Sequence, residues 1–173
     1  MNQLKYFLIL MICAGSLHSC YSFTGSSLTD EKTIQINEFP NTAPLVNPAL
    51  AQQFSTSIQN RFLQRTTLKG TKENPDILIE GEIVDYTITP TTISSNTQQT
   101  SAGIIQESQN KLTITVKVHY ENKLHPDVSF DRTYSDEAVF NSSLSQSDIE
   151  VSQVKIATDR IINKIFNDIV ANW

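Results

Sequence analysis

The sequence predicts an α+β domain, a two-layer sandwich in which two helices cover one face of a four-stranded mixed sheet. Three observations indicate this fold. Two segments carry apolar residues at helical spacing, several segments alternate apolar and polar residues with the period of a strand, and their order along the chain is β-α-β-β-β-α. Because each helix has a single apolar stripe, both helices must pack against the apolar face of one sheet.

The first strand and the first helix are predicted in the N-terminal part of this domain. A strand is expected over 33–39, where isoleucines alternate with polar residues. Asn47 followed by Pro48 is typical of a helix start, because an Asn side chain can cap the first turn and proline suits the first helical position. The helix is expected over 48–65 and is followed by a turn-rich break over 68–76. Its apolar stripe consists of Leu50, Phe54, Ile58 and Phe62.

Three further strands are predicted, over 76–89, 111–122 and 128–140. The apolar pattern of the first of them changes face halfway. Either a β-bulge near Gly81 resets the register, or the second half of the strand buries its opposite face elsewhere. The helical crossover makes the first two strands of the sheet parallel, and hairpins add the others. The strand over 111–122 has an apolar face and a polar face, and the polar face comprises Lys111, Thr113, Thr115, Lys117 and His119.

A second helix is predicted from residue 147 to near Trp173. Ser147 and Glu150 have the spacing of a capping box at its start. Its apolar stripe is predicted to contain Val151, Val154, Ile161, Ile165 and Ile169, widened by Ile162 and Phe166.

The N-terminal residues differ in composition from the rest of the chain. Lys5 is followed by an almost wholly apolar stretch over 6–15, which is the pattern of a secretory signal. An uncleaved anchor is less favoured, because a helix needs roughly 20 apolar residues to cross a bilayer. The sequence LHSC at 17–20 then resembles the lipobox of bacterial lipoproteins, in which the cysteine is acylated and becomes the first residue. His18 departs from the small or β-branched residue that is usual there.

This resemblance implies a division of the chain into three parts: a signal peptide over 1–19, a lipidated tether over 20–32 and a folded domain over 33–173. Cys20 would carry an N-acyl diacylglyceryl lipid, and each buried methylene of its chains would contribute about 0.8 kcal/mol to membrane binding. No acidic residue directly follows Cys20, which favours the outer membrane. Ordinary secretion with a free thiol is the alternative.

Composition argues against several classes of function. The chain has 13 basic and 18 acidic residues and a net charge of −5, whereas a nucleic-acid partner requires a basic face. Loss of Cys13 with the leader and acylation of Cys20 would leave no thiol for a disulfide, a metal or nucleophilic attack. His119 and His125 lack suitably spaced metal-ligand partners. We therefore predict no catalytic residue, no metal site and no cofactor.

The connection over 90–110 is long for two neighbouring strands, because hairpin loops have about two to five residues. Fourteen of its 21 residues are Ser, Thr, Asn or Gln. It is either a tolerated insertion or a segment that becomes ordered in a polar environment, with Ile104 and Ile105 as a small apolar anchor.

Several motifs together resemble the LptE family of lipopolysaccharide-assembly lipoproteins, in the form found in Bacteroidota. They are the lipobox with CYSFTG, the element order, the segment FPNTAPLVNPALAQQF and the C-terminal IFNDIVANW. The resemblance covers Cys20 to Trp173. It implies a non-enzymatic protein, lipid-anchored at the periplasmic side of the outer membrane. Such a protein plugs the lumen of the LptD β-barrel and helps to deliver lipopolysaccharide to the outer leaflet. The polar lumen of a large barrel suits a surface of hydroxyls and amides.

The chain departs from proteobacterial members of this family. Those members contact the anionic glycolipid through basic residues in the loop between strands two and three and near the last helix. Here 90–110 and 141–147 contain no Lys or Arg, so a barrel partner is favoured over direct binding of lipopolysaccharide. The candidate contacts to the barrel or to the lipid are Ile104, Ile105, Lys111, Lys117 and His119.

A second resemblance leaves an alternative function open. The segment PDILIEGEIVDYTIT at 75–89 is also similar to a strand of periplasmic lipoproteins such as LpoB and CsgG. Those proteins activate peptidoglycan synthases or build secretion pores. An adaptor of that kind would also have helices on a sheet.

Overall fold

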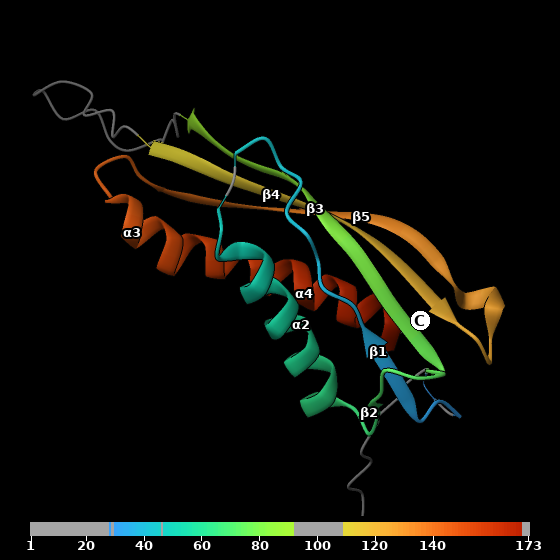
Figure 1. The fold of residues 1–173 in the computed structure, drawn as a ribbon. Coiled ribbons are helices and arrows are strands. Elements are labelled where there is room, and N and C mark those ends of the chain that lie inside the picture. The colour runs from blue at the N-terminus through green and yellow to red at the C-terminus, as the bar shows by residue number, and fades with distance from the viewer. Residues whose placement is uncertain (1–27, 29, 46, 92–108, 171–173) are drawn as a thin grey trace, which may run out of the picture.

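The computed structural model describes residues 28, 30–45, 47–91 and 109–170, which form a sheet covered by two long helices (Figure 1). The elements are β1 (Thr33–Ile36), α2 (Leu50–Arg65), β2 (Lys69–Gly70), β3 (Ile77–Thr91), β4 (Gln109–Asn122), a 3₁₀ turn (Pro126–Val128), β5 (Phe130–Asn141), α3 (Gln146–Asp148), a π-helical turn (Ile149–Gln153) and α4 (Val154–Val170). The predicted α+β class and two-layer arrangement are confirmed.

The sheet has five strands in the order β2-β1-β3-β4-β5, so the prediction of four strands was wrong. β1 pairs in parallel with β3, and β3, β4 and β5 pair antiparallel, as predicted. The additional strand is β2, which pairs in parallel with β1 inside the segment predicted to be a turn-rich break. Because β2 has only two residues, it leaves no alternating pattern in the sequence.

Helix α2 lies on the core side of the sheet and begins at Leu50 instead of Pro48. The Asn47 carboxamide accepts a hydrogen bond from the Ala49 amide at 3.1 Å, which forms a turn before the helix and does not cap it. The predicted apolar stripe is confirmed, since all its members are fully buried: Leu50, Phe54, Ile58 and Phe62. Its last ring packs against Phe166 of α4, with centroids 5.1 Å apart.

The first turn of the C-terminal helix is capped by a serine that lies earlier in the chain than predicted. The Ser145 hydroxyl accepts a hydrogen bond from the Asp148 amide at 3.2 Å and donates one to the Asp148 carboxylate at 2.6 Å. The predicted capping box at Ser147 was therefore wrong. A serine two residues upstream satisfies the same helix terminus.

A π-helical turn over Ile149–Gln153 changes the phase of this helix before α4 begins. Its hydrogen bonds span five residues rather than four, so the apolar residues around it no longer follow α-helical spacing. Val151, predicted to lie on the apolar stripe, is 75% exposed for this reason. Most of the predicted stripe is buried, namely Val154, Ile161, Ile162, Ile165 and Ile169, and Phe166 is partly buried.

The change of face along β3 results from a β-bulge at Val84. Ile83 pairs with Val116 of β4 and Asp85 pairs with the preceding Thr115, so Val84 is the extra residue. The predicted bulge is confirmed, but it lies further along the strand than expected. The fully or nearly fully buried side chains of β3 are Ile77, Ile79 and Ile83 before the bulge and Tyr86 after it.

Gly81, where the bulge was predicted, is instead a point of close approach. A Cβ atom at this position would lie 2.1 Å from the carbonyl oxygen of Lys117 and 2.6 Å from the ring of Phe39. Phe39 is fully buried and packs against Phe54, with ring centroids 5.1 Å apart. The missing side chain therefore allows an aromatic ring to rest directly on the backbone of the sheet.

Asp76 joins the start of β1 to the start of β3. Its carboxylate accepts hydrogen bonds from the Lys32 amide, the Thr33 amide and the Thr33 hydroxyl, each at 2.9 Å. These hydrogen bonds, led by that from Lys32, hold the pKa of Asp76 below its ordinary value.

We expect the Asp76→Asn variant to be less sensitive to acid than the wild type. A carboxyl group whose pKa is depressed in the folded state stabilises the fold above its unfolded pKa of about 3.9, and this contribution disappears as the pH falls through the folded pKa. Urea unfolding at about pH 5 and about pH 2 measures the difference. The wild type should lose more unfolding free energy than Asp76→Asn, and a Glu73→Gln control should behave like the wild type. Equal losses in wild type and Asp76→Asn would contradict this role.

Candidate functional site

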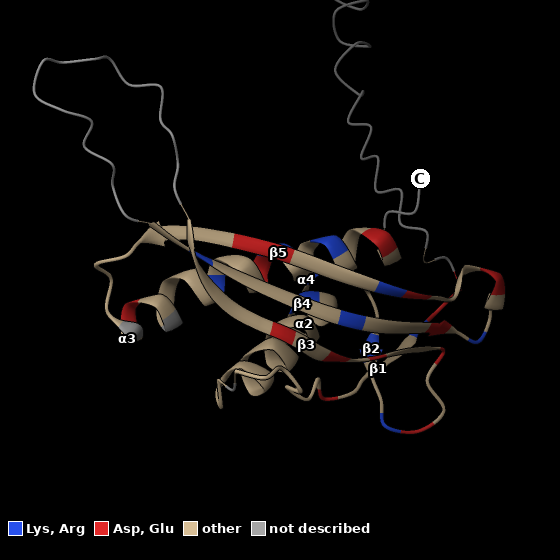
Figure 2. Ribbon diagram, turned by 90° about the horizontal axis from the view of Figure 1, so that it is seen from above, with Lys and Arg blue, Asp and Glu red and all other residues tan. Residues whose placement is uncertain are grey.

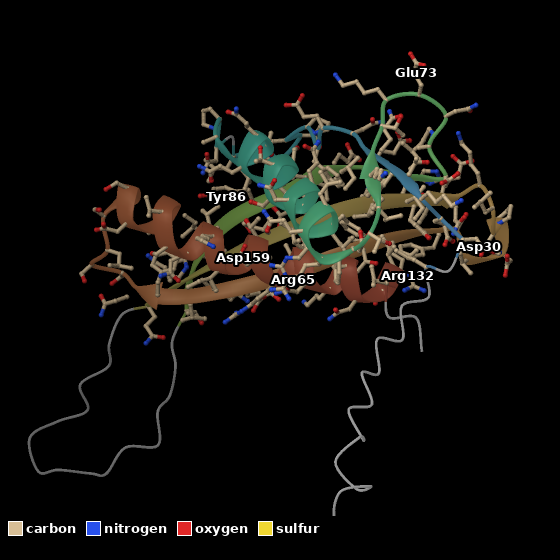
Figure 3. The ribbon with its side chains drawn as sticks, turned by 90° about the horizontal axis from the view of Figure 1, so that it is seen from below. Asp30, Arg65, Glu73, Tyr86, Arg132 and Asp159 are labelled. Carbon is tan, nitrogen blue, oxygen red and sulfur yellow. The ribbon has the colours of Figure 1, made fainter. Side chains whose placement is uncertain are left out.

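The face of the sheet opposite the helices is open and polar. Figure 2 shows β3, β4 and β5 with no described helix across this face, and Figure 3 shows α2 and α4 covering the other side. Alternate side chains of each strand point to opposite faces, so the buried set of β4 defines its outward set. This outward set is the predicted one: Lys111, Thr113, Thr115, Lys117 and His119.

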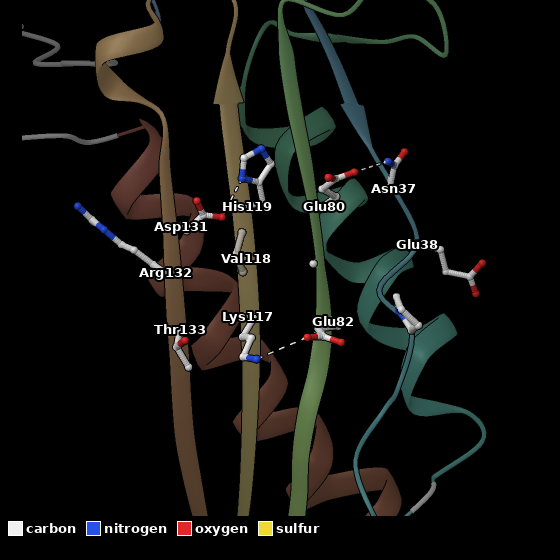
Figure 4. A pocket seen from close by; sticks show the side chains of 12 residues that line it. Asn37, Glu38, Glu80, Glu82, Lys117, Val118, His119, Asp131, Arg132 and Thr133 are labelled. Atoms are coloured by element: carbon white, nitrogen blue, oxygen red, sulfur yellow. Dashed lines mark hydrogen bonds and ion pairs between the residues drawn. The ribbon is translucent and has the colours of Figure 1, made fainter.

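Basic residues of β4 on the open face lie next to acidic residues of the neighbouring strands β3 and β5. His119 pairs in register with Glu80 on one side and Asp131 on the other. Its Nδ1 lies 2.8 Å from the Asp131 carboxylate. Lys117 pairs in register with Glu82, and their charged groups are 3.7 Å apart (Figure 4).

Lys111, near the start of β4, is paired as well, with its ammonium 2.8 Å from the Glu137 carboxylate of β5. Exposed ion pairs of this kind contribute about 0–1 kcal/mol each. Their importance here is that they neutralise the basic groups locally. All three basic residues predicted as candidate contacts therefore already have a carboxylate neighbour.

Carboxylates outnumber basic groups on the described part of the open face. The acidic residues are Glu80, Glu82, Asp85, Glu121, Asp131 and Glu137, and the basic ones are Lys111, Lys117 and His119. A surface with this balance has a negative potential and does not attract phosphate groups. The open face is therefore better suited to a neutral or basic protein surface than to an anionic lipid.

A shallow hollow of about 610 Å³ lies in the middle of this face. It brings Lys117 and His119 together with Asp131 and Thr133 of β5 (Figure 4). Lys111 lies outside the hollow, nearer the start of the same strand. The other candidate contacts, Ile104 and Ile105, lie outside the described residues, as does Cys20.

The hollow contains no catalytic arrangement among the residues that the structure describes. His119 and Asp131 form a dyad, but the only hydrogen bond recorded for the His119 ring is the one to Asp131, so no hydroxyl is positioned for attack. Across the same ranges, no three His, Cys, Asp or Glu side chains are close enough together to hold a metal ion.

A second recess, of about 510 Å³, follows the outer edge of β1. It lies between β1, the end of α2 and β2, and its apolar lining includes Ile36 and Leu63. The sequence offers one signal for it: Leu63 adjoins the apolar stripe of α2 without belonging to it. The sequence carries no signal for the open edge of β1, because this edge depends on the residue at which β2 ends.

A buried polar cluster fixes the point at which the N-terminal segment joins the domain. Asn122, 1% exposed, donates hydrogen bonds to the Glu31 carboxylate at 2.5 Å and the Tyr120 hydroxyl at 3.3 Å. Its carbonyl accepts from the amides of Leu124 and His125, both at 3.0 Å. Burial raises the pKa of Glu31, whereas the hydrogen bonds from Asn122 and from neighbouring amides lower it. The hydrogen bonds together outweigh burial, so the pKa of Glu31 lies below its ordinary value. Glu31 is thus held charged in the core.

The described helices are all too short or too polar to cross a bilayer.

These features define an α+β domain with an open, charge-paired sheet face. The sequence model of the LptE family, described as lipopolysaccharide-assembly, matches residues 31–172. The chain belongs to the LptE family, which confirms the resemblance seen in its motifs.

Several solved bacterial lipoproteins have a similar arrangement of elements. A minor lipoprotein from Acinetobacter baumannii is 15% identical with a TM-score of 0.48, over 82% of this chain and 94% of its own. Lipoprotein GNA1162 from Neisseria meningitidis is 12% identical with a TM-score of 0.41, over 79% and 99%. The rare lipoprotein B from Shewanella oneidensis is 4% identical with a TM-score of 0.43, over 79% and 90%. No curated protein matches the sequence, and the family assignment therefore rests on the family model.

Proposed function

We propose that this protein is a non-enzymatic outer-membrane lipoprotein whose open sheet face packs inside an LptD-type β-barrel and supports lipopolysaccharide transport and insertion. The observation that carries the proposal is the open face, on which hydroxyls and locally paired charges replace a second layer of helices. The lumen of a large barrel is polar, so a domain inside it must present satisfied polar groups. Membership of the lipopolysaccharide-assembly family supports the same role.

The point at which the N-terminal segment enters the domain supports an orientation in which one end of the sheet faces the anchoring membrane and the other end points into the barrel. In this proposal Cys20 carries the lipid, and the chain enters the domain at Glu31, next to Asn122 at the end of β4. The connection between Thr91 and Gln109 leaves the sheet at its other end. The 15 residues of β3 span about 50 Å, so Thr91 and Gln109 would lie far from the anchored end and deep inside the partner.

The paired charges make the barrel a better partner than the lipid for the candidate contacts. Lys111, Lys117 and His119 each have a carboxylate neighbour, and a phosphate would have to displace it. We therefore assign these residues to contacts with the barrel wall, with lipopolysaccharide binding as a secondary possibility.

Affinity purification of the full-length protein from its own envelope tests the proposal. We expect the wild type to recover an outer-membrane barrel, and Thr133→Trp, a bulky change on the open face, to reduce recovery about tenfold. That loss corresponds to about 1.4 kcal/mol. The matched control is Asn60→Trp on the exposed side of α2, which should behave like the wild type. Deletion of 92–108 should also weaken recovery.

Other outcomes would overturn the proposal. Recovery of a peptidoglycan synthase in place of a barrel would favour an adaptor of the LpoB or CsgG kind. Normal surface lipopolysaccharide after depletion of the protein would exclude the transport role.

A further inference from the structure

The outer edge of β1 is only half covered. β2 pairs with the first two residues of β1 and then ends, although β1 continues to Ile36. The Asn37 amide donates to the Ile79 carbonyl of β3, and the Ile34 carbonyl accepts from Thr71 on the opposite side. Because backbone groups alternate along a strand, the amide and carbonyl of Ile36 point to the same side as those of Ile34. This is the side that β2 no longer covers.

Within the part of the chain that the structure describes, the Ile36 amide is therefore available at an open strand edge. The Ile36 carbonyl has no strand partner on this side and instead accepts a hydrogen bond from the Gln59 carboxamide of α2 at 3.1 Å. Within the described ranges the β1–β2 ladder stops at Ile34 and Gly70, one rung before it would reach the Ile36 amide. Open edges of this kind accept an added strand from another chain.

The recess beside this edge has room and apolar surface for such a strand. Its volume is about 510 Å³. Leu63 lines it and is 45% exposed, and Gly70, which adjoins Leu63, contributes no side chain to the lining. Alternate side chains of a strand point to the same face. A strand added next to Ile36 would therefore direct one of its side chains onto Leu63.

Charges at the recess also indicate a polypeptide partner. Glu38 and Lys72 both line it, and neither forms an ion pair within the part of the chain that the structure describes. The basic groups of the sheet face, by contrast, are paired with carboxylates. Glu38 points away from β3 (Figure 4). A complementary segment carries a basic side chain for Glu38 and an acidic one for Lys72.

The recess is continuous with the surface assigned to the barrel, because Asn37 and Glu38 line both the recess and the hollow of the sheet face. We propose that an extended segment of the barrel partner adds to β1 as a strand, with an apolar side chain over Leu63 and a hydrogen bond from the Ile36 amide. This inference rests on the proposed function and identifies a second point of contact with the same partner.

The test compares Ile36→Pro with Ile36→Val in the full-length protein. Proline removes the amide that faces the open edge, where proline is tolerated in strands, whereas valine keeps the amide and a similar side chain. We expect Ile36→Pro to recover about tenfold less barrel, as expected for a lost hydrogen bond that leaves its partner carbonyl unsatisfied. Ile36→Val should recover as much as the wild type. Thermal unfolding establishes that both variants are folded.

Leu63→Glu provides a second measurement in case Ile36→Pro does not fold. It should also reduce recovery, whereas Leu124→Glu, at a leucine that is 48% exposed in the β4–β5 turn, should not. A photo-crosslinking residue at Thr71 should form an adduct with the barrel. Undiminished recovery with folded Ile36→Pro or Leu63→Glu, while Thr133→Trp loses the barrel, would overturn the strand addition and leave the proposed function standing. If none of these variants loses the barrel, both proposals fail.

Discussion

Replacing Gly81 with alanine is expected to lower the free energy of unfolding by about 3 kcal/mol, as for a group forced into a filled core. The new Cβ would lie 2.1 Å from the Lys117 carbonyl oxygen and 2.6 Å from the Phe39 ring. The first neighbour is backbone of the adjacent strand, so a change of side-chain rotamer cannot relieve the contact. Either β3 and β4 separate locally, or Phe39 leaves its position against Phe54. Urea unfolding of the purified domain measures the loss.

Gly70→Ala is the matched control for this substitution. A Cβ at Gly70 would meet only Leu63, at 3.7 Å, which is an ordinary van der Waals contact. Its free energy of unfolding should stay within about 0.5 kcal/mol of the wild type. Similar stabilities for the Gly81→Ala and Gly70→Ala variants would show that Gly81 is not a point of close approach.

Asn122→Ala is expected to lower the free energy of unfolding by about 3 kcal/mol, because it removes several hydrogen bonds at once, one of them to the buried Glu31 carboxylate. The Glu31 carboxylate loses its side-chain donor, and the amides of Leu124 and His125 lose their acceptor. The largest of these penalties is the loss of the Asn122 donor by the buried Glu31 carboxylate, which keeps the Asp30 amide as a donor. Chemical denaturation at neutral pH measures the effect.

Two comparisons separate this network from an ordinary turn. Asn141→Ala removes an exposed carboxamide that accepts from the Ser143 amide at 2.9 Å, and it should cost no more than about 1 kcal/mol. In the Asn122→Ala background, Glu31→Gln should recover part of the lost stability, because no charge then remains buried. Additive losses in the double variant would argue against a coupled network.

Regular patterns in the sequence predicted the parts of the fold that depend on burial along a single element. The stripe of α2 and the two faces of β4 follow directly from their periods of about four and two residues. Where a local irregularity intervenes, the prediction failed in detail. The π-helical turn removed Val151 from its stripe, and β2 was too short to have a period.

The candidate site was predictable to the same extent. Alternation in β4 placed Lys117 and His119 on one open face, which the structure confirms. Their partners Glu82 and Asp131 depend on the register between strands, which includes a bulge that the sequence located only approximately. The open edge at Ile36 depends on the end of β2, and no local pattern marks that end.

The hydrogen bond between Asn122 and Glu31 has a mechanical consequence if Cys20 is held in a membrane. Traction on the N-terminal segment first reaches a buried carboxylate that is bonded to the end of β4, and then Asp76, which ties β1 to β3. Because β1 and β3 run parallel, a load along β1 shears their hydrogen bonds together instead of opening them one at a time. A domain anchored in this way would bear the pull on its N-terminal segment without unfolding from that end.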